Sequence, residues 1–381
     1  MKLLLILLIG GDHVNLTVPH MGSYWIASKT LFENLGVNVI IPPKTTKRTI
    51  ELGVKYAPEF ACFPLKITLG NFIEAAEQGA DTFLIPGGIG PCRFGFYGPV
   101  HKEILNDLGY QAELVIGEPP SAGFINLIKG ISPLIKNISL KMLSEAGKLS
   151  WTKLLAIDHV SKSLNEWRPY EKEKHSLENL KTTTFTKLNK ANSPEEVDKI
   201  KENFNSELSR LVTEKSINPI RVAIVGEIFL NLDETANQKI EQKLGLLGVE
   251  IERSIYLSDW IQENLLPGKN HQKEKKHEIK KLAKPYLNDF VGGHGRESVG
   301  EAVLAHLEGL DGVIHVSPFT CMPEITAQGV LPKASNDLNF PIMSLSFDEQ
   351  TGEAGVNTRL EAFIDLILKK RHSQSEHCRI S

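Results

Sequence analysis

The segment Gly312-Val-Ile-His-Val-Ser-Pro-Phe-Thr-Cys-Met-Pro-Glu324 is the most informative part of the chain for its fold. Its apolar run from Val313 to Val316 is typical of a strand that is covered on both faces, as in a parallel sheet. We expect the strand to end at Ser317-Pro318, because proline has no backbone N–H to donate to a neighbouring strand. Cys321 follows at once, in a loop bracketed by prolines. Since open α/β sheets bind ligands at the carboxyl ends of their strands, this loop is a candidate site.

Two other cysteines stand in a similar setting. Cys62 lies in Phe60-Ala-Cys-Phe-Pro64, and Cys92 lies in Gly87-Gly-Ile-Gly-Pro-Cys-Arg93, directly after a short apolar strand. Free cysteine is usually a small buried hydrophobe. That interpretation fits poorly with glycine- and proline-rich loops beyond strands, where the backbone turns outward. Three thiolates from distant parts of the chain can converge if two α/β domains face each other across a cleft.

The three cysteines are candidate metal ligands. Three thiolates without an obvious fourth ligand suit a cubane iron–sulfur cluster with one open iron, because such clusters prefer cysteine. Zinc is the alternative, with His20 or His315 as the fourth ligand. The chain has no Cys-x-x-Cys motif, so the pattern leaves both open. Glu59, Arg93 and Glu324 flank the cysteines, and we expect them either to tune a cluster by hydrogen bonds and charge or to form salt bridges.

Composition limits the class of protein. A chain of 381 residues is too long for one ordinary core and predicts two or three domains. A net charge of −3 gives no reason to expect nucleic acid or an anionic membrane as a partner. The apolar residues 1–9 are far fewer than the ~20 needed to cross a bilayer. We expect them to form a buried strand or a disordered extension rather than an export signal, and we expect a cytoplasmic protein.

Alternation of strands and helices predicts βαβ units and mainly parallel sheets. We expect a first α/β domain over residues 1–123, a helical connector over 124–215, a second α/β domain over 216–372 and a disordered tail over 373–381. The predicted strands span residues 16–19, 37–41, 82–85, 221–225, 248–253, 313–316 and 341–347. The predicted helices outside the connector span residues 24–35, 46–55, 67–78, 234–247, 297–308 and 359–369, and residues 269–281 read as a solvated helix or loop.

A glycine-rich segment, residues 292–300, precedes one of these helices. Free amides and the helix dipole at a helix N-terminus attract anions, so Gly293, Gly295 and Arg296 form a candidate anion-binding loop. The segment matches neither the Walker lysine pattern nor a dinucleotide fingerprint. A structural tight turn is the equal alternative.

Acidic residues follow the last predicted strand. Asp348 and Glu349 stand at its carboxyl end, and we expect them to line the site as proton-transfer groups, metal ligands or helix caps. Further on, the segment Thr358-Arg-Leu-Glu361 has the pattern of a capping box and predicts the start of the last helix.

Taken together, these stretches resemble the 2-hydroxyacyl-CoA dehydratase family, in particular its uncharacterised relatives of the CoA-enzyme activase and 2-hydroxyglutaryl-CoA dehydratase D-component type. The stretches that carry the resemblance are Pro19–Gly22, Lys55–Pro64, Gly90–Arg93, Gly293–Glu297, Pro318–Glu324, Phe347–Glu349 and Thr358–Phe363. They cover both α/β halves but not the helical middle.

The resemblance implies an α/β fold with two flavodoxin- or Rossmann-like parallel-sheet domains and a helical connecting region. It also implies a [4Fe–4S] cluster at the domain interface, with Cys62, Cys92 and Cys321 at the ligand positions. In this family a separate ATP-hydrolysing activator of the actin/Hsp70 superfamily supplies a low-potential electron. The electron passes to a CoA thioester, and the resulting ketyl radical anion can lose water.

The resemblance leaves part of the function open. We find no actin-like ATPase signature in the chain, so an activator would be another protein. We expect an oxygen-sensitive, anaerobic electron-transfer protein that forms a homodimer or a heterodimer, and we identify no catalytic residue. The alternatives are a cluster-bearing electron carrier or assembly partner without its own substrate, a zinc protein, and a dinucleotide oxidoreductase.

Overall fold

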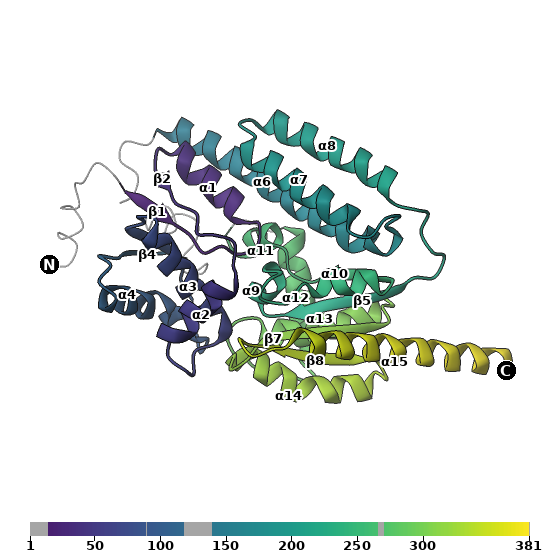
Figure 1. The fold of residues 1–381 in the computed structure, drawn as a ribbon. Helices are drawn as coiled ribbons and strands as arrows, with labels where there is room; N and C mark the ends of the chain where they lie inside the picture. The colour runs from purple at the N-terminus through teal and green to yellow at the C-terminus, as the bar shows by residue number, and fades with distance from the viewer. Residues whose placement is uncertain (1–13, 89, 118–138, 266–269, 381) are drawn as a thin grey trace.

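The computed structural model describes residues 14–88, 90–117, 139–265 and 270–380, so the apolar residues 1–9 lie outside the described part. It contains two four-stranded parallel sheets, each surrounded by helices, and a layer of long helices above them (Figure 1). The prediction of an α/β fold with two flavodoxin- or Rossmann-like parallel-sheet domains is therefore confirmed.

The first sheet has the strand order β2-β1-β3-β4. Its strands are β1 (Asn15–Thr17), β2 (Asn38–Val39), β3 (Thr82–Pro86) and β4 (Glu113–Gly117). Its helices are α1 (Trp25–Asn34), α2 (Lys47–Tyr56), α3 (Phe63–Glu77) and α4 (Tyr97–Asp107). Helix α3 begins at Phe63, four residues before Ile67, where the sequence predicts its start. All its residues from Phe63 to Ala76 are buried, so no polar face marks where the helix starts.

The second sheet has the order β6-β5-β7-β8. Its strands are β5 (Ile220–Gly226), β6 (Val249–Arg253), β7 (Gly312–Pro318) and β8 (Ile342–Phe347). Its helices are α9 (Ile228–Leu232), α10 (Ile240–Leu246), α11 (Leu257–Asn264), α12 (His271–Ala283), α13 (Gly295–Leu307), α14 (Met322–Asp337) and α15 (Glu353–Ile380). Every residue of β7 is buried, as its apolar run predicts.

Two predicted helices of this half differ from the structure. Of the helix predicted over 234–247, only the last part forms, as α10. The helix cannot extend back towards residue 234, because Gln238 and Lys239 take left-handed conformations with φ of 55° and 58°. The capping box predicted at Thr358 is wrong, since Thr358 lies inside α15 and its hydroxyl donates to the Ala354 carbonyl at 3.1 Å. Helix α15 also continues through most of the segment expected to be a disordered tail.

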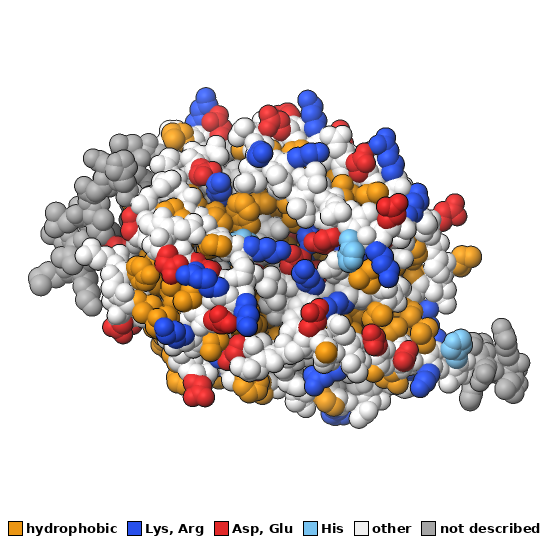
Figure 2. Space-filling model, in the orientation of Figure 1, with side chains coloured by type: hydrophobic (Ala, Val, Ile, Leu, Met, Phe, Trp, Pro, Cys, Tyr) orange, Lys and Arg blue, Asp and Glu red, His pale blue; other side chains and the backbone are white. Residues whose placement is uncertain are grey.

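The helical layer consists of α6 (Leu140–Trp167), α7 (Ser176–Lys190) and α8 (Pro194–Leu211), at the top of Figure 1. Helix α6 packs against α1 of the first sheet and against β6 of the second, so the layer joins the two α/β parts. Basic and acidic side chains are interspersed over the face shown in Figure 2. No helix in the described ranges is long and apolar enough to cross a membrane.

Candidate functional site

Candidate site residues follow the carboxyl ends of the central strands in both sheets. The strand order reverses between β1 and β3 in the first sheet and between β5 and β7 in the second, which is where such sheets bind ligands. Strand β3 leads to Cys92, β5 leads to Glu227, and β7 leads to Cys321. The Cys62 loop precedes α3, the helix that leads into β3.

All three cysteines occupy the residue before a helix. Cys62 precedes α3, Cys321 precedes α14, and Cys92 precedes a short 3₁₀ helix (Arg93–Phe96) that continues into α4. The free N–H groups and the dipole at a helix N-terminus favour a negatively charged sulfur or cluster. Pro64 and Pro323, each two residues after its cysteine, fit this geometry, because the first helical turn does not need their N–H groups.

The cysteines are more enclosed than their loops suggested. Cys62 and Cys321 are buried, with 8% and 7% of their surface exposed, and Cys92 is half-buried. Burial raises the pKa of all three thiols. They are therefore protonated at neutral pH when no metal is bound, and a metal that binds them must displace protons.

Arg93 joins the three cysteine loops. Its guanidinium group donates to the Phe60 carbonyl at 2.8 Å and to the Thr320 carbonyl. The Thr320 hydroxyl also donates to the Phe60 carbonyl at 3.2 Å. Because Phe60 stands two residues before Cys62 and Thr320 directly before Cys321, these bonds fix the loops of the two sheets against each other.

Tyr97 is a site residue that the sequence reasoning missed. Its hydroxyl forms a hydrogen bond with the Cys62 sulfur, and only 2% of the residue is exposed. Burial and the neighbouring Cys62 thiol raise the pKa of Tyr97, so its hydroxyl stays protonated and can donate to a thiolate. Its place at the start of α4, five residues beyond Cys92, was the available signal.

Glu227 is the second residue that was missed. Its two carboxylate oxygens accept the backbone N–H groups of Phe229 at 2.9 Å and Leu230 at 3.0 Å. Burial raises the pKa of Glu227 to about 7, against the lowering effect of these bonds. The negative charge of ionised Glu227 raises the pKa of all three cysteine thiols. Its position at the end of a buried parallel strand could have identified it, by the argument that identified Cys321.

Glu324 lies in the first turn of α14, three residues after Cys321, and is fully buried. It accepts a hydrogen bond from the Ser298 hydroxyl at 2.9 Å and contacts His315 Nε2 at 2.8 Å. His315 Nδ1 pairs with the Ser344 hydroxyl at 3.1 Å. Both ring nitrogens of His315 are therefore engaged, and His315 is not free to act as the alternative zinc ligand.

Two other predicted residues have different environments. His20 is buried beside Trp25, with ring centroids 5.9 Å apart, and its backbone N–H donates to Asn71. Burial lowers the pKa of His20 to about 4, which keeps the ring neutral. Glu59 is exposed, and no ion pair of Glu59 is found within the described residues.

The two acidic residues after β8 have different roles: Asp348 stabilises a turn, and Glu349 connects the two sheets. Asp348 accepts hydrogen bonds from the Gln350 N–H at 2.9 Å and the Thr351 hydroxyl at 2.7 Å, which close a turn. Glu349 forms an ion pair with the buried Lys66 on α3 at 2.6 Å. Glu349 therefore connects the second sheet to the helix that begins at Cys62.

The glycine loop packs against two of the cysteine segments. Side-chain carbons at Gly292 and Gly293, whose φ values are 83° and 48°, would lie 2.8 Å from Cys92 N and 3.1 Å from Pro323. A side chain at Gly295 would lie 2.3 Å from the Pro323 carbonyl. Close packing explains these glycines, and Arg296 donates to the Asn288 carbonyl at 3.2 Å. Anion binding by this loop stays a prediction.

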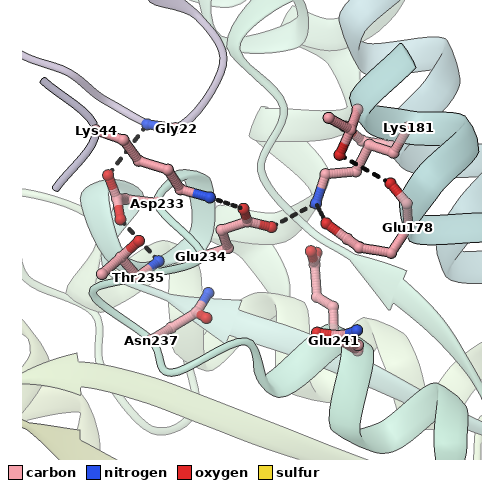
Figure 3. A network of polar contacts seen from close by, with 12 residues as sticks. Gly22, Lys44, Glu178, Lys181, Asp233, Glu234, Thr235, Asn237 and Glu241 are labelled. Carbon is pink, nitrogen blue, oxygen red and sulfur yellow. Dashed lines mark hydrogen bonds and ion pairs between the residues drawn. The ribbon is translucent and has the colours of Figure 1, made fainter. Parts of the chain in front are cut away.

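A polar network fixes the three parts of the chain beside one another (Figure 3). Asp233 accepts from the Gly22 N–H of the first part at 3.1 Å. The neighbouring Glu234 pairs with Lys44 of the first part at 3.1 Å and with Lys181 of helix α7. The network therefore holds the two sheets in the arrangement that brings the cysteine loops together.

The described residues contain no group of three His, Cys, Asp or Glu side chains placed around one point as the ligands of a single metal ion are. The cysteines of a cubane each bind a different iron, so a cubane does not need that arrangement.

Comparison with protein families gives two matches. A model described as 2-hydroxyglutaryl-CoA dehydratase, D-component, matches residues 155–367, which include Cys321. A model described as CoA enzyme activase uncharacterised domain matches residues 18–90, which include Cys62. No curated protein matches the chain. The D-component match spans more than half of the chain.

Proposed function

Because the chain belongs to the 2-hydroxyglutaryl-CoA dehydratase D-component family, we propose that it is a dehydratase-like protein with a [4Fe–4S] cluster held by Cys62, Cys92 and Cys321. The observation that carries the proposal is the placement of these cysteines. Each stands at a helix N-terminus, and Arg93 joins their loops across the interface between the two sheets.

The donor set suits the cluster. Iron–sulfur clusters prefer cysteine thiolates, and three of them leave one iron without a protein ligand. Helix N-termini stabilise the negative charge that thiolates and cluster carry together. The Cys62 and Cys321 sulfurs lie in a buried setting that restricts access of water. When bound, the cluster supplies one-electron transfer to or from a group at its open iron.

The protein residues have separate roles in this proposal. Tyr97 donates a hydrogen bond to the Cys62 sulfur, and Arg93 holds the loops at a fixed separation. The ion pair of Glu349 with Lys66 keeps α3, and with it Cys62, against the second sheet. Such fixed surroundings reduce the reorganisation that accompanies electron transfer.

The family also suggests partners. We propose that a separate actin/Hsp70-superfamily ATPase activator delivers low-potential electrons to the cluster and that a CoA thioester receives them. We also propose that the protein forms a homodimer or a heterodimer. The cytoplasm fits this proposal, because cysteines stay reduced there.

Electron paramagnetic resonance (EPR) of the anaerobically reconstituted and reduced protein tests the substrate. Added acyl-CoA thioester should change the cluster signal, whereas free CoA and NADH should leave it unchanged. A signal that no thioester alters would overturn the dehydratase proposal and favour an electron carrier. A change on adding NADH would favour the dinucleotide oxidoreductase.

A further inference from the structure

A cavity lies where the first part of the chain, the helical layer and the second sheet meet. It is lined by residues 22–24, by α6, the turn after it and α7, and by residues of the segment 231–242 together with Arg253 at the end of β6. None of the residues that line it belongs to a cysteine loop. The cavity encloses a space of about 50 Å³. Because one water molecule needs about 10–15 Å³ of such space, there is room for one ion of the size of phosphate.

Basic side chains outnumber acidic ones around this cavity. Six charged residues line it: Arg168, Lys181, Lys239, Arg253, Glu234 and Glu241. Both acids already have basic partners. Glu234 pairs with Lys44 and Lys181 (Figure 3). Glu241 pairs with Arg253 at 3.2 Å. The positive charge that remains is available to an anion.

Arg168 and Lys239 supply most of this remaining positive charge. Arg168 shares its only acidic partner, Glu178, with Lys181. The contact of Glu178 with Lys181 is the shorter one, at 2.8 Å against 3.3 Å. Lys239 is exposed and forms no ion pair with another residue of the described ranges. An excess of cations in a recess raises the local concentration of anions.

The cavity also has buried polar atoms that lack a partner. Within the described part of the chain, Arg168 Nε, Arg253 Nε and Asn231 Oδ1 accept or donate no hydrogen bond. All three residues are more than nine-tenths buried, where an unpaired polar atom is costly. The amide of Asn231 has a fixed orientation, because its Nδ2 donates to the Glu227 carbonyl at 3.0 Å. The cavity therefore offers two guanidinium donors and one amide acceptor to a ligand.

Gly245 makes room for Arg168 beside the cavity. A side-chain carbon at Gly245 would lie 2.5 Å from Arg168 Cδ and 2.6 Å from its Cγ. Gly245 stands inside helix α10, where alanine would favour the helix more strongly. The glycine is thus explained by the Arg168 side chain, whose stem lies across α10.

We propose that this cavity binds a small oxyanion that carries a proton, namely free phosphate. Its oxygens accept from the guanidinium groups of Arg168 and Arg253, and its P–OH group donates to Asn231 Oδ1. Lys239 adds positive charge. The ion would contact all three parts of the chain and hold them in the arrangement that brings the cysteine loops together. The inference goes beyond the proposed function and does not depend on the cluster.

The test is isothermal titration calorimetry of the full-length protein with inorganic phosphate at pH 7, in potassium chloride at constant ionic strength. The wild-type protein should bind one phosphate per chain. R168Q should bind phosphate at least about tenfold more weakly, because it removes a buried charged donor. K239Q removes an exposed charge and should weaken binding about threefold. K47Q removes a largely exposed charge outside the cavity and should bind as wild type does.

Glycerol phosphate separates the free ion from the phosphate group of a larger molecule. Because the enclosed space is small, the ester should bind more weakly than inorganic phosphate, and tighter binding of the ester would overturn the assignment to the free ion. The absence of any heat of binding at millimolar phosphate would overturn the inference. So would R168Q and K239Q proteins that bind phosphate as tightly as wild type. Circular dichroism checks that R168Q is folded, and K239Q alone decides the question if it is not.

Discussion

Replacement of Glu234 by glutamine removes the carboxylate that joins the first sheet, the helical layer and the second sheet. Glu234 forms ion pairs with Lys44 and with Lys181, and the latter also pairs with Glu178 (Figure 3). About a quarter of the Glu234 side chain is exposed, and Lys181 is largely buried. Solvent therefore screens these ion pairs only in part.

The pKa of Glu234 sets the expected size of the effect. Burial raises this pKa, but Lys181 and Lys44 outweigh burial and bring it from 4.5 to about 2. Each unit between the folded and unfolded pKa values is worth about 1.4 kcal/mol. The ionised carboxylate should therefore contribute about 3 kcal/mol to the free energy of unfolding at pH 7. Because the folded pKa is lowered, this contribution is complete above pH 4.5 and is lost as the pH falls towards 2.

Urea unfolding at pH 7 and pH 3 measures this contribution. E234Q should be less stable than wild type by about 3 kcal/mol at pH 7, and by less than half of that at pH 3. E51Q is the control, because the pair of Lys47 with Glu51 is largely exposed and should contribute less than about 0.5 kcal/mol. An E234Q protein as stable as E51Q at pH 7, or a difference that does not change with pH, would refute the reasoning.

Three further substitutions test other parts of the structure. Y97F removes the hydrogen bond to the Cys62 sulfur, which should lower the cluster's reduction potential in a redox titration; an unchanged potential would argue against that bond. G226A places a side chain 2.0 Å from the Val316 carbonyl at a φ of 127° and should cost more than ~2 kcal/mol, and a melting temperature equal to wild type would contradict this close approach. F72A empties a fully buried position and should cost about 3 to 5 kcal/mol in urea unfolding, while a cost below ~1 kcal/mol would mean that the site is not a packed core.

Sequence patterns located the parts of the site that follow buried strands. The apolar run before Cys321 predicted β7, and the same rule placed Cys92 after β3. The central strands were predictable because a parallel strand that is buried on both faces gives a continuous apolar segment. Strand β4 was not predicted, since most of its residues are exposed or half-buried and it lacks such a segment. The start of α3 was not predictable, since that helix is also buried on all sides and its apolar pattern does not change at the helix boundary.

The missed residues show a limit of another kind. Tyr97 and Glu227 are single polar side chains whose importance arises from the meeting of two sheets. A local pattern indicates that a carboxylate follows β5, but only the pairing of β5 with β7 shows that this carboxylate lies at the same sheet edge as the Cys321 loop. For Asp348 and Glu349 the sequence predicted the same role, at the site, but the structure gives them different ones. Asp348 stabilises a turn, and Glu349 forms an ion pair with Lys66.

The central claim is that Cys62, Cys92 and Cys321 together hold one iron–sulfur cluster, and metal analysis of the anaerobically reconstituted protein tests it most directly. The wild-type protein should be brown and contain about four iron and four sulfide per chain. Each single cysteine-to-serine variant should lose most of this iron while remaining folded by circular dichroism. A colourless wild-type protein that takes up zinc but no iron, or three variants that all keep the full cluster, would contradict the account.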